Sequence, residues 1–215
     1  MKSKVTTAPA SEPVSLADLK VSLRITNTAE DTLLAQYITD AREIVERYTS
    51  RKLITQTLTG YASSCHGESG EWWEGYRMGH SRILSGVMEH IELDNGPVQS
   101  ITSVATVDTD NTESAYASTN YYLDNYDDDM MPRIVFNDDA DAPTSLRLRD
   151  SWKVVYVAGY GDNASDVPAD IRRALTMLAG YLWANRGACG GDKDCVSGCG
   201  AMSMLDRYRI NYALS

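Results

Sequence analysis

The stretch TAEDTLLAQYITDAREIVERYTSRKLITQTLTGY, residues 28–61, passes from one periodicity to another and decides the fold class. In its first part, apolar residues recur three or four positions apart, which is the spacing of one face of an α-helix. These residues are Leu33, Leu34, Tyr37, Ile38, Ala41, Ile44, Val45 and Tyr48. From Leu53 the sequence becomes rich in Thr, Val, Ile and Tyr with a period of two, which is typical of β-strands. A helix followed at once by strands predicts a mixed fold.

The polar positions of this helix are expected to face water. They are Asp40, Arg42, Glu43, Glu46 and Arg47. Glu43 and Arg47 are four residues apart, so they form a weak supporting pair on an exposed helix.

A second helix is predicted on the N-terminal side of this stretch. Ser15 followed by Asp18 resembles a capping box, because a serine oxygen accepts an amide of the first turn. Residues 1–12, before Pro13, are mainly Ser, Thr, Ala and Lys without periodicity, and are expected to be a flexible arm.

On the C-terminal side, strands give way to a last helix. Strands are predicted at 54–61, 88–93, 98–107, 114–123, 133–136 and 146–158. Asp166 and Pro168 predict the start of a third helix, because aspartate caps helices and proline is tolerated at the first helical position.

The predicted fold class is therefore α+β, with a small core of three main helices and a large antiparallel β insertion between the second and third. A single domain is expected over residues 13–187, with helices in 13–52 and 166–187 and the insertion at 53–160. Residues 188–215 are expected to form a loop and an amphipathic tail.

Composition excludes several classes of protein. The chain has 30 Asp and Glu against 20 Lys and Arg, a net charge of −10, which argues against wrapping nucleic acid by neutralising phosphates. No stretch approaches the roughly 20 apolar residues of a membrane span, and the N-terminus lacks a secretory signal, so no membrane partner and a cytoplasmic location are expected.

Catalytic signatures are missing from the sequence. It has no P-loop, Rossmann fingerprint, H-E-x-x-H or G-x-S-x-G motif, so no catalytic residues and no cofactor are predicted. His66, His80 and His90 have no carboxylate or cysteine partner at a fixed spacing and are interpreted as surface or loop histidines.

Three sequence features leave alternatives open. Cys189, Cys195 and Cys199 are interpreted as free thiols, with a disulfide or a zinc site completed by Cys65 and His66 as alternatives. The acidic run containing Asp127, Asp128 and Asp129 lacks the glycine and glutamate of an EF-hand loop, so it is either a solvated turn or the lining of a DNA channel. The aromatic residues of the glycine-rich stretch 63–82 either fold onto their own sheet or form a subunit or partner interface. They are Trp72, Trp73 and Tyr76.

Short segments in a fixed order carry a family resemblance over most of residues 12–186. They are EPVSLADLK (12–20), LRI (23–25), AREIVERYT (41–49), LITQT (53–57), NGPVQSI (95–101), YYL (121–123), PRI (132–134), VAGYG (157–161) and VPADIR (167–172). This ordered set resembles the head–tail connector family of tailed bacteriophages and prophages.

The resemblance implies a virion protein of the neck, assembled in the host cytoplasm as a ring of about twelve copies. Its partners would be the portal protein, a stopper or tail-terminator protein, and DNA that passes through the lumen without specific binding. Closed rings need heterologous interfaces between copies. The C-terminal segment of the family tends to reach the portal, and the corresponding residues here are Leu205, Arg207, Tyr208, Arg209 and Ile210.

Two other functions compete with the adaptor ring. A tail-completion or stopper protein of the same neck would bind the tail instead of the portal. A metal-dependent hydrolase would need bound metal and a convergent pocket. Within the adaptor hypothesis, the particle could be a phage, a prophage remnant or a gene transfer agent.

Overall fold

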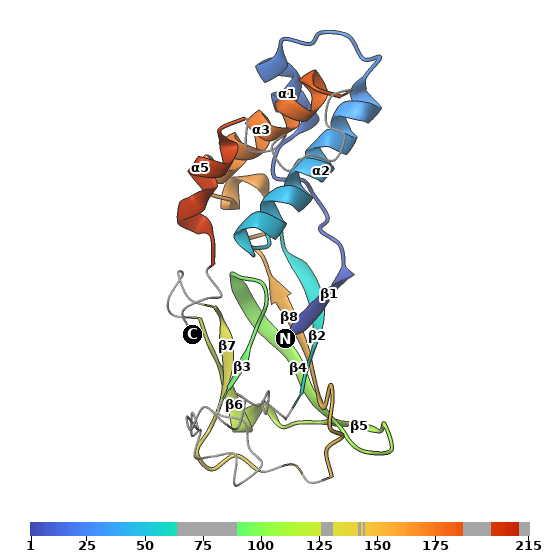
Figure 1. Ribbon diagram of the computed structural model, residues 1–215, viewed down its shortest axis with the longest axis vertical. Helices are drawn as coiled ribbons and strands as arrows, with labels where there is room; N and C mark the ends of the chain where they lie inside the picture. Colours follow the sequence, from blue (N-terminus) through green and yellow to red (C-terminus); the bar gives the residue numbers. More distant parts are fainter. Residues whose placement is uncertain (64–89, 126–130, 142, 144, 187–198, 211–215) are drawn as a thin grey trace, which may run out of the picture. The chain divides into compact units, whose positions relative to one another are not determined.

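The computed structural model describes residues 1–63, 90–125, 131–141, 143, 145–186 and 199–210 (Figure 1). Its contacts divide the chain into two compact units. The β unit consists of residues 1–7 and 57–157, and the helical unit of residues 8–56 and 158–215. The described elements mix helices with antiparallel sheets, so the predicted α+β class is confirmed.

The helical unit contains four described α-helices. They are α1 (Leu16–Leu23), α2 (Asp31–Thr49), α3 (Ala169–Ala184) and α5 (Ala201–Leu205). The 3₁₀ turns η4 (Ala164–Asp166) and η5 (Asp206–Tyr208) precede α3 and follow α5. The capping prediction for α1 is confirmed, because the Ser15 hydroxyl accepts the Asp18 amide at 3.1 Å.

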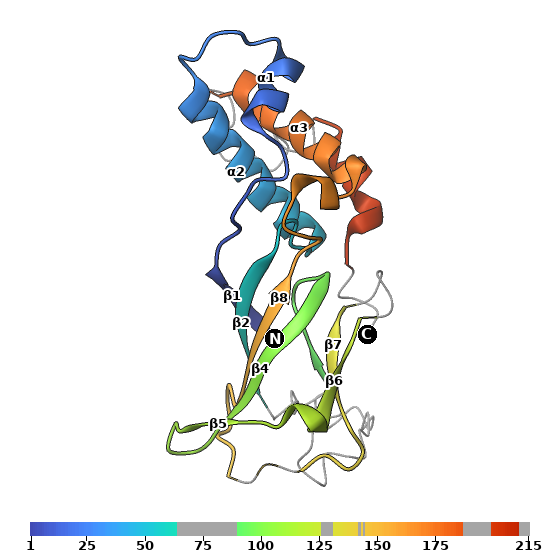
Figure 2. The same cartoon turned by 180° about the vertical axis from the view of Figure 1, so that it is seen from behind.

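Packing between α2 and α3 forms the centre of this unit, and the two helices lie side by side in both views (Figure 2). Half of the apolar positions that predict α2 are buried, namely Leu34, Ile38, Ala41 and Val45, and the others are half-buried, namely Leu33, Tyr37, Ile44 and Tyr48. On α3, Ile171, Leu175 and Leu178 are buried and Leu182 is half-buried. The start of α3 differs from the prediction, since Pro168 occupies the cap position and Asp166 instead closes a capping box with Asn163 at η4.

The β unit has two sheets. The five-stranded sheet has the order β1-β2-β8-β4-β5, and the three-stranded sheet has the order β3-β7-β6. Their bounds are β1 (Lys2–Thr7), β2 (Gln56–Ala62), β3 (His90–Glu92), β4 (Val98–Val107), β5 (Glu113–Ala115), η3 (Ser118–Asn120), β6 (Tyr121–Asp124), β7 (Arg133–Phe136) and β8 (Trp152–Ala158).

An aromatic cluster lies in the core of the β unit. Alternate residues of β8 are buried, as the period of two predicts, and Trp152 is fully buried among them. Its ring lies edge-on to Tyr116 with centroids 5.1 Å apart, and 4.9 Å from the ring of Phe136. Such aromatic pairs stabilise the fold by about 0.5–1.5 kcal/mol beyond the contribution of the apolar area that they bury.

The expectation of a flexible arm is wrong for residues 2–7, which form β1. This strand pairs antiparallel with β2, with Lys2 opposite Tyr61, and its side chains are mostly exposed. Asp94 accepts the Ser3 amide at 2.8 Å. Because backbone pairing and not apolar burial holds β1, its sequence carries no alternating hydrophobic pattern.

Candidate functional site

Most of the site residues predicted from sequence lie outside the described residues. These are Trp72, Trp73 and Tyr76, then Asp127, Asp128 and Asp129, and the thiols and imidazole of Cys65, His66, Cys189 and Cys195. Cys199 is described, is half-buried and packs against the core of the helical unit. Predictions for the other residues stay predictions.

Within the described ranges, no cluster of three or more His, Cys, Asp or Glu could hold a metal ion. None of the helices in the same part of the chain has both the length and the apolarity of a membrane span.

The C-terminal segment, residues 205–210, is the predicted site that the structure does describe. Leu205 and Ile210 are almost completely buried within the helical unit. The Ile210 amide donates to the Thr49 carbonyl at 3.1 Å, and Arg51 Nε donates to the Tyr208 carbonyl at 2.6 Å. These contacts fix the segment to the end of α2, so Leu205 and Ile210 serve as anchors within their own chain.

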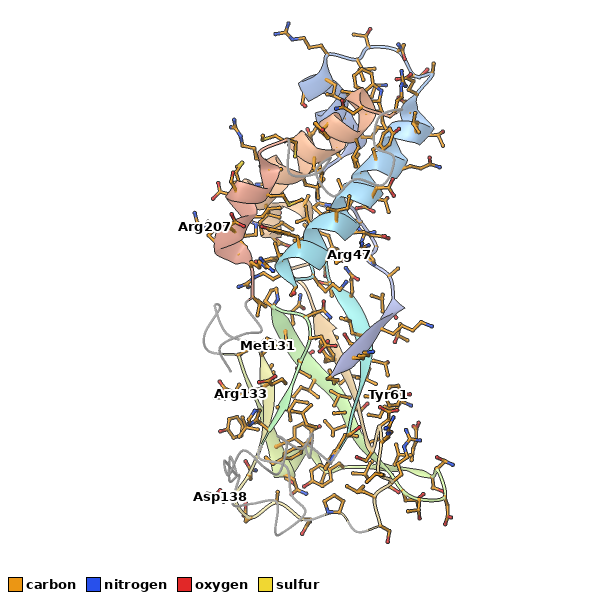
Figure 3. The ribbon with its side chains drawn as sticks, viewed as in Figure 1. Arg47, Tyr61, Met131, Arg133, Asp138 and Arg207 are labelled. Carbon is orange, nitrogen blue, oxygen red and sulfur yellow. The ribbon has the colours of Figure 1, made fainter. Side chains whose placement is uncertain are left out.

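Arg207, labelled in Figure 3, and Arg209 of the same segment are exposed, and Tyr208 between them is half-buried. The guanidinium of Arg207 lies 3.3 Å from Asp170 and over the ring of Tyr208, 5.0 Å from the ring centroid. Arg209 lies over the ring of Tyr48 with a separation of 5.4 Å. A guanidinium group over an aromatic ring keeps N–H donors available for a second partner. We call Tyr48, Arg207, Tyr208 and Arg209 the cation–aromatic surface.

Hydrogen bonds hold this surface in place. The Tyr48 hydroxyl donates to Asp206, and this bond is the main reason that the pKa of Tyr48 is raised. The Tyr208 hydroxyl lies 3.5 Å from Asp170, which also pairs with Arg207. The surface is therefore assembled from the end of α2 and the C-terminal segment, which lie about 150 residues apart in the sequence.

The helical unit also contains a buried ionic network, so the prediction that the polar face of α2 is exposed is wrong for two of its residues. Arg42 and Glu46 are buried and not exposed. Glu46 accepts from Lys52 at 2.9 Å, from Gln56 at 2.8 Å and from the Leu53 amide at 3.2 Å. Arg42 lies 3.6 Å from Glu46 and donates to Glu12 at 2.8 Å. The spacing of Arg42 and Glu46, opposite charges four residues apart, was the available signal.

A second polar clamp joins the beginning of α2 to the end of α3. Glu30 accepts from Arg186 and from the Trp183 indole, both at 2.7 Å. The bond from Arg186, followed by that from Trp183, lowers the pKa of Glu30 below its ordinary value. The clamp therefore depends on an ionised carboxylate.

Charge is distributed unequally between the two units. The β unit has 17 Asp and Glu against 8 Lys and Arg, a net charge of −9. The helical unit has 13 against 12, a net charge of −1. Nearly all the net negative charge of the chain therefore belongs to the β unit.

Comparisons with known proteins agree with this architecture. A family model described as phage gp6-like head-tail connector protein matches residues 13–132. A chain from the neck of an empty GTA particle, computed with C6 symmetry, is 23% identical and has a TM-score of 0.72. A chain from the virion of a native gene transfer agent particle is 21% identical and has a TM-score of 0.73. Each alignment covers 100% of this chain and 98% of the other. A search of curated proteins found no match.

Proposed function

Because this chain belongs to the phage gp6-like head-tail connector family, we propose that it forms a ring at the neck of a tailed phage or phage-like particle. The ring would lie between the portal and the stopper or tail protein, and DNA would pass through it. The family is one of structural proteins and not of enzymes, so we expect no turnover. The observation that carries the proposal is the family match over residues 13–132, joined by a likeness of fold to neck chains over the whole length.

The cation–aromatic surface is the proposed contact with the portal. Arg207 is 70% exposed, and Arg209 is exposed beside it. Two guanidinium groups next to tyrosine rings are the kind of anchor that dominates protein interfaces, and they favour a carboxylate-bearing partner. Leu205 and Ile210 would support this contact from within by fixing the backbone of the segment.

The β unit is proposed to face the DNA. A net charge of −9 repels phosphates, so DNA could slide past without being held. Asp127, Asp128 and Asp129 belong to this unit by sequence and are the proposed lining.

Electron cryomicroscopy of the purified particle tests the proposal. A ring of this chain directly below the portal, with density from Arg207 and Arg209 reaching the portal, would support it. A position further down, against the tail alone, would favour the stopper hypothesis. Absence of the chain from the neck, or a purified monomer that holds stoichiometric zinc, would refute the adaptor function.

A paired substitution tests the portal contact separately. Arg207→Glu with Arg209→Glu should weaken co-sedimentation with the portal by at least about tenfold, because interface arginines beside aromatic rings are common hot spots. Arg149→Glu is the matched control, since it reverses an exposed arginine of the β unit. Equal binding by both variants would show that these arginines do not contact the portal.

A further inference from the structure

A second surface of the helical unit is open and apolar. It is a groove of about 350 Å³ between α1 and α3, lined by Ser22, Leu23, Thr176, Met177, Gly180, Tyr181 and Cys199. The two helices pack closely here, because a Cβ at Gly180 would lie 3.1 Å from Leu23 Cδ2. Met177, a large apolar side chain, is 38% exposed there. None of these residues belongs to the cation–aromatic surface.

Two exposed arginines flank this groove. Arg24 directly follows Leu23, and Arg173 lies one helical turn before Met177 on α3. Neither arginine forms an ion pair with any residue in the described ranges. The rim of the groove is therefore cationic and available to carboxylates.

A complementary face exists on α2. Asp40 and Glu43 are exposed, and neither has an ion-pair partner within the described part of the chain. The half-buried Tyr37 and Ile44 border them, so the face combines negative charge with apolar side chains. Arg47 is the exposed cation of this face, one turn after Glu43. Asp40 and Glu43 give the face a net negative charge.

We infer that the groove between α1 and α3 of one copy receives the outer face of α2 from the next copy. Arg24 and Arg173 would meet Asp40 and Glu43, while Tyr37 and Ile44 would cover the apolar lining. A groove and a helix face are different patches of one chain, so the contact is head-to-tail, as ring closure requires. The inference rests on the proposed ring and names the surfaces that build it.

Electrostatics favours the helical unit as the place where copies meet. Two β units brought together would each carry −9, whereas two helical units would each carry −1. Like charges close together in an interface are unfavourable, so a near-neutral unit with opposite charges on two faces suits self-association.

Charge reversal on each face gives the test. The groove variant carries Arg24→Glu and Arg173→Glu, and the face variant carries Asp40→Arg and Glu43→Arg. Native mass spectrometry of the full chain mixed with its portal counts the bound copies. Each variant alone should need at least about tenfold more protein to complete the ring, since it sets like charges against each other at every contact. Arg149→Glu and Asp139→Arg, exposed residues of the β unit, are the matched controls and should assemble like the wild type.

A mixture of the two variants distinguishes a head-to-tail contact from a folding defect. In a ring that alternates the two, every groove meets a face of opposite charge. An equal mixture should therefore assemble within about threefold of the wild-type concentration, although each variant alone fails. Wild-type assembly by either single variant, or failure of the mixture, would overturn the inference and leave the proposed function standing. Failure of the wild-type chain to assemble on the portal would overturn both.

Discussion

The β unit and the helical unit treat charge in opposite ways. Within the described part of the chain, the buried charged residues Arg42, Glu46 and Arg51 all belong to the helical unit, which is nearly neutral. The β unit carries the excess of carboxylates and buries an aromatic cluster around Trp152. A buried charge is tolerable only when it is paired, and pairing needs a balanced composition. The nearly neutral unit therefore buries paired charges, whereas the acidic unit buries aromatic rings.

The largest expected loss of stability comes from removing the buried indole ring of the β unit. Trp152→Ala should lower the free energy of unfolding by about 4 kcal/mol, because it removes a fully buried ring and leaves a cavity. Urea unfolding followed by far-UV circular dichroism measures this loss. Trp152→Phe is the control and should lose far less, since the indole nitrogen has no hydrogen-bond partner among the described residues. Similar losses in both variants would mean that ring packing is not the stabilising element.

A slightly smaller effect is expected from breaking the ionic side. Glu46→Ala should destabilise the protein by about 3 kcal/mol, because it leaves Arg42 and Lys52 beneath the surface without their shared carboxylate. Glu43→Ala is the control, because Glu43 lies three residues before Glu46 on the exposed face of the same helix. It should change the free energy of unfolding by less than about 0.5 kcal/mol. Thermal unfolding of both variants provides the measurement. If the two variants melt together, the network does not stabilise the helical unit.

The stability of the helical unit should depend on pH through Glu30. Glu30 has a lowered pKa in the folded protein, so its contribution to stability is complete above the ordinary value of 4.5 and is lost as pH falls through the folded pKa. The wild type should therefore lose more stability than Glu30→Gln on acidification below 4.5. Denaturant midpoints across this range measure the difference. Parallel pH profiles would contradict a role for the ionised clamp.

The smallest expected effect concerns salt. Raising ionic strength from low values to about 0.5 M should slow amide exchange in the β unit more than in the helical unit, because salt screens repulsion among exposed carboxylates. Hydrogen-exchange mass spectrometry can compare peptides of β2 and β8 with peptides of α2 and α3. A larger response from the helical peptides would show that net charge does not limit the β unit.

Sequence patterns predicted the regular elements with a strong apolar period. The strand at 133–136 has the bounds of β7, and the alternation of Trp152, Val154 and Tyr156 matches burial along β8. Helix α2 begins at Asp31, with Glu30 at its cap position but without a side-chain cap hydrogen bond. Glu30 is instead engaged by Trp183 and Arg186, more than 150 residues further along the chain. The local sequence around a helix start contains no information about partners so far away along the chain.

The candidate site was only partly predictable. The family resemblance pointed to Leu205, Arg207, Tyr208, Arg209 and Ile210 as portal-docking residues, a role that remains a proposal. The sequence did not indicate that Leu205 and Ile210 are used within the helical unit, or that Tyr48 joins the surface. Apolar side chains in a tail look the same whether they anchor to their own chain or to another.

The sequence by itself determined the α+β class, the main helices and the acidity of the molecule, because these follow from local periodicity and composition. Only the tertiary structure decided that Lys2–Thr7 is a strand, that Arg42 and Glu46 are buried, and that the C-terminal segment is fixed to α2. Each of these depends on partners distant in sequence, such as β2 for β1 and Glu12 for Arg42. Whether a polar group lies in water or in the core is set by those partners, since burial is favourable only where they satisfy its charge and hydrogen bonds.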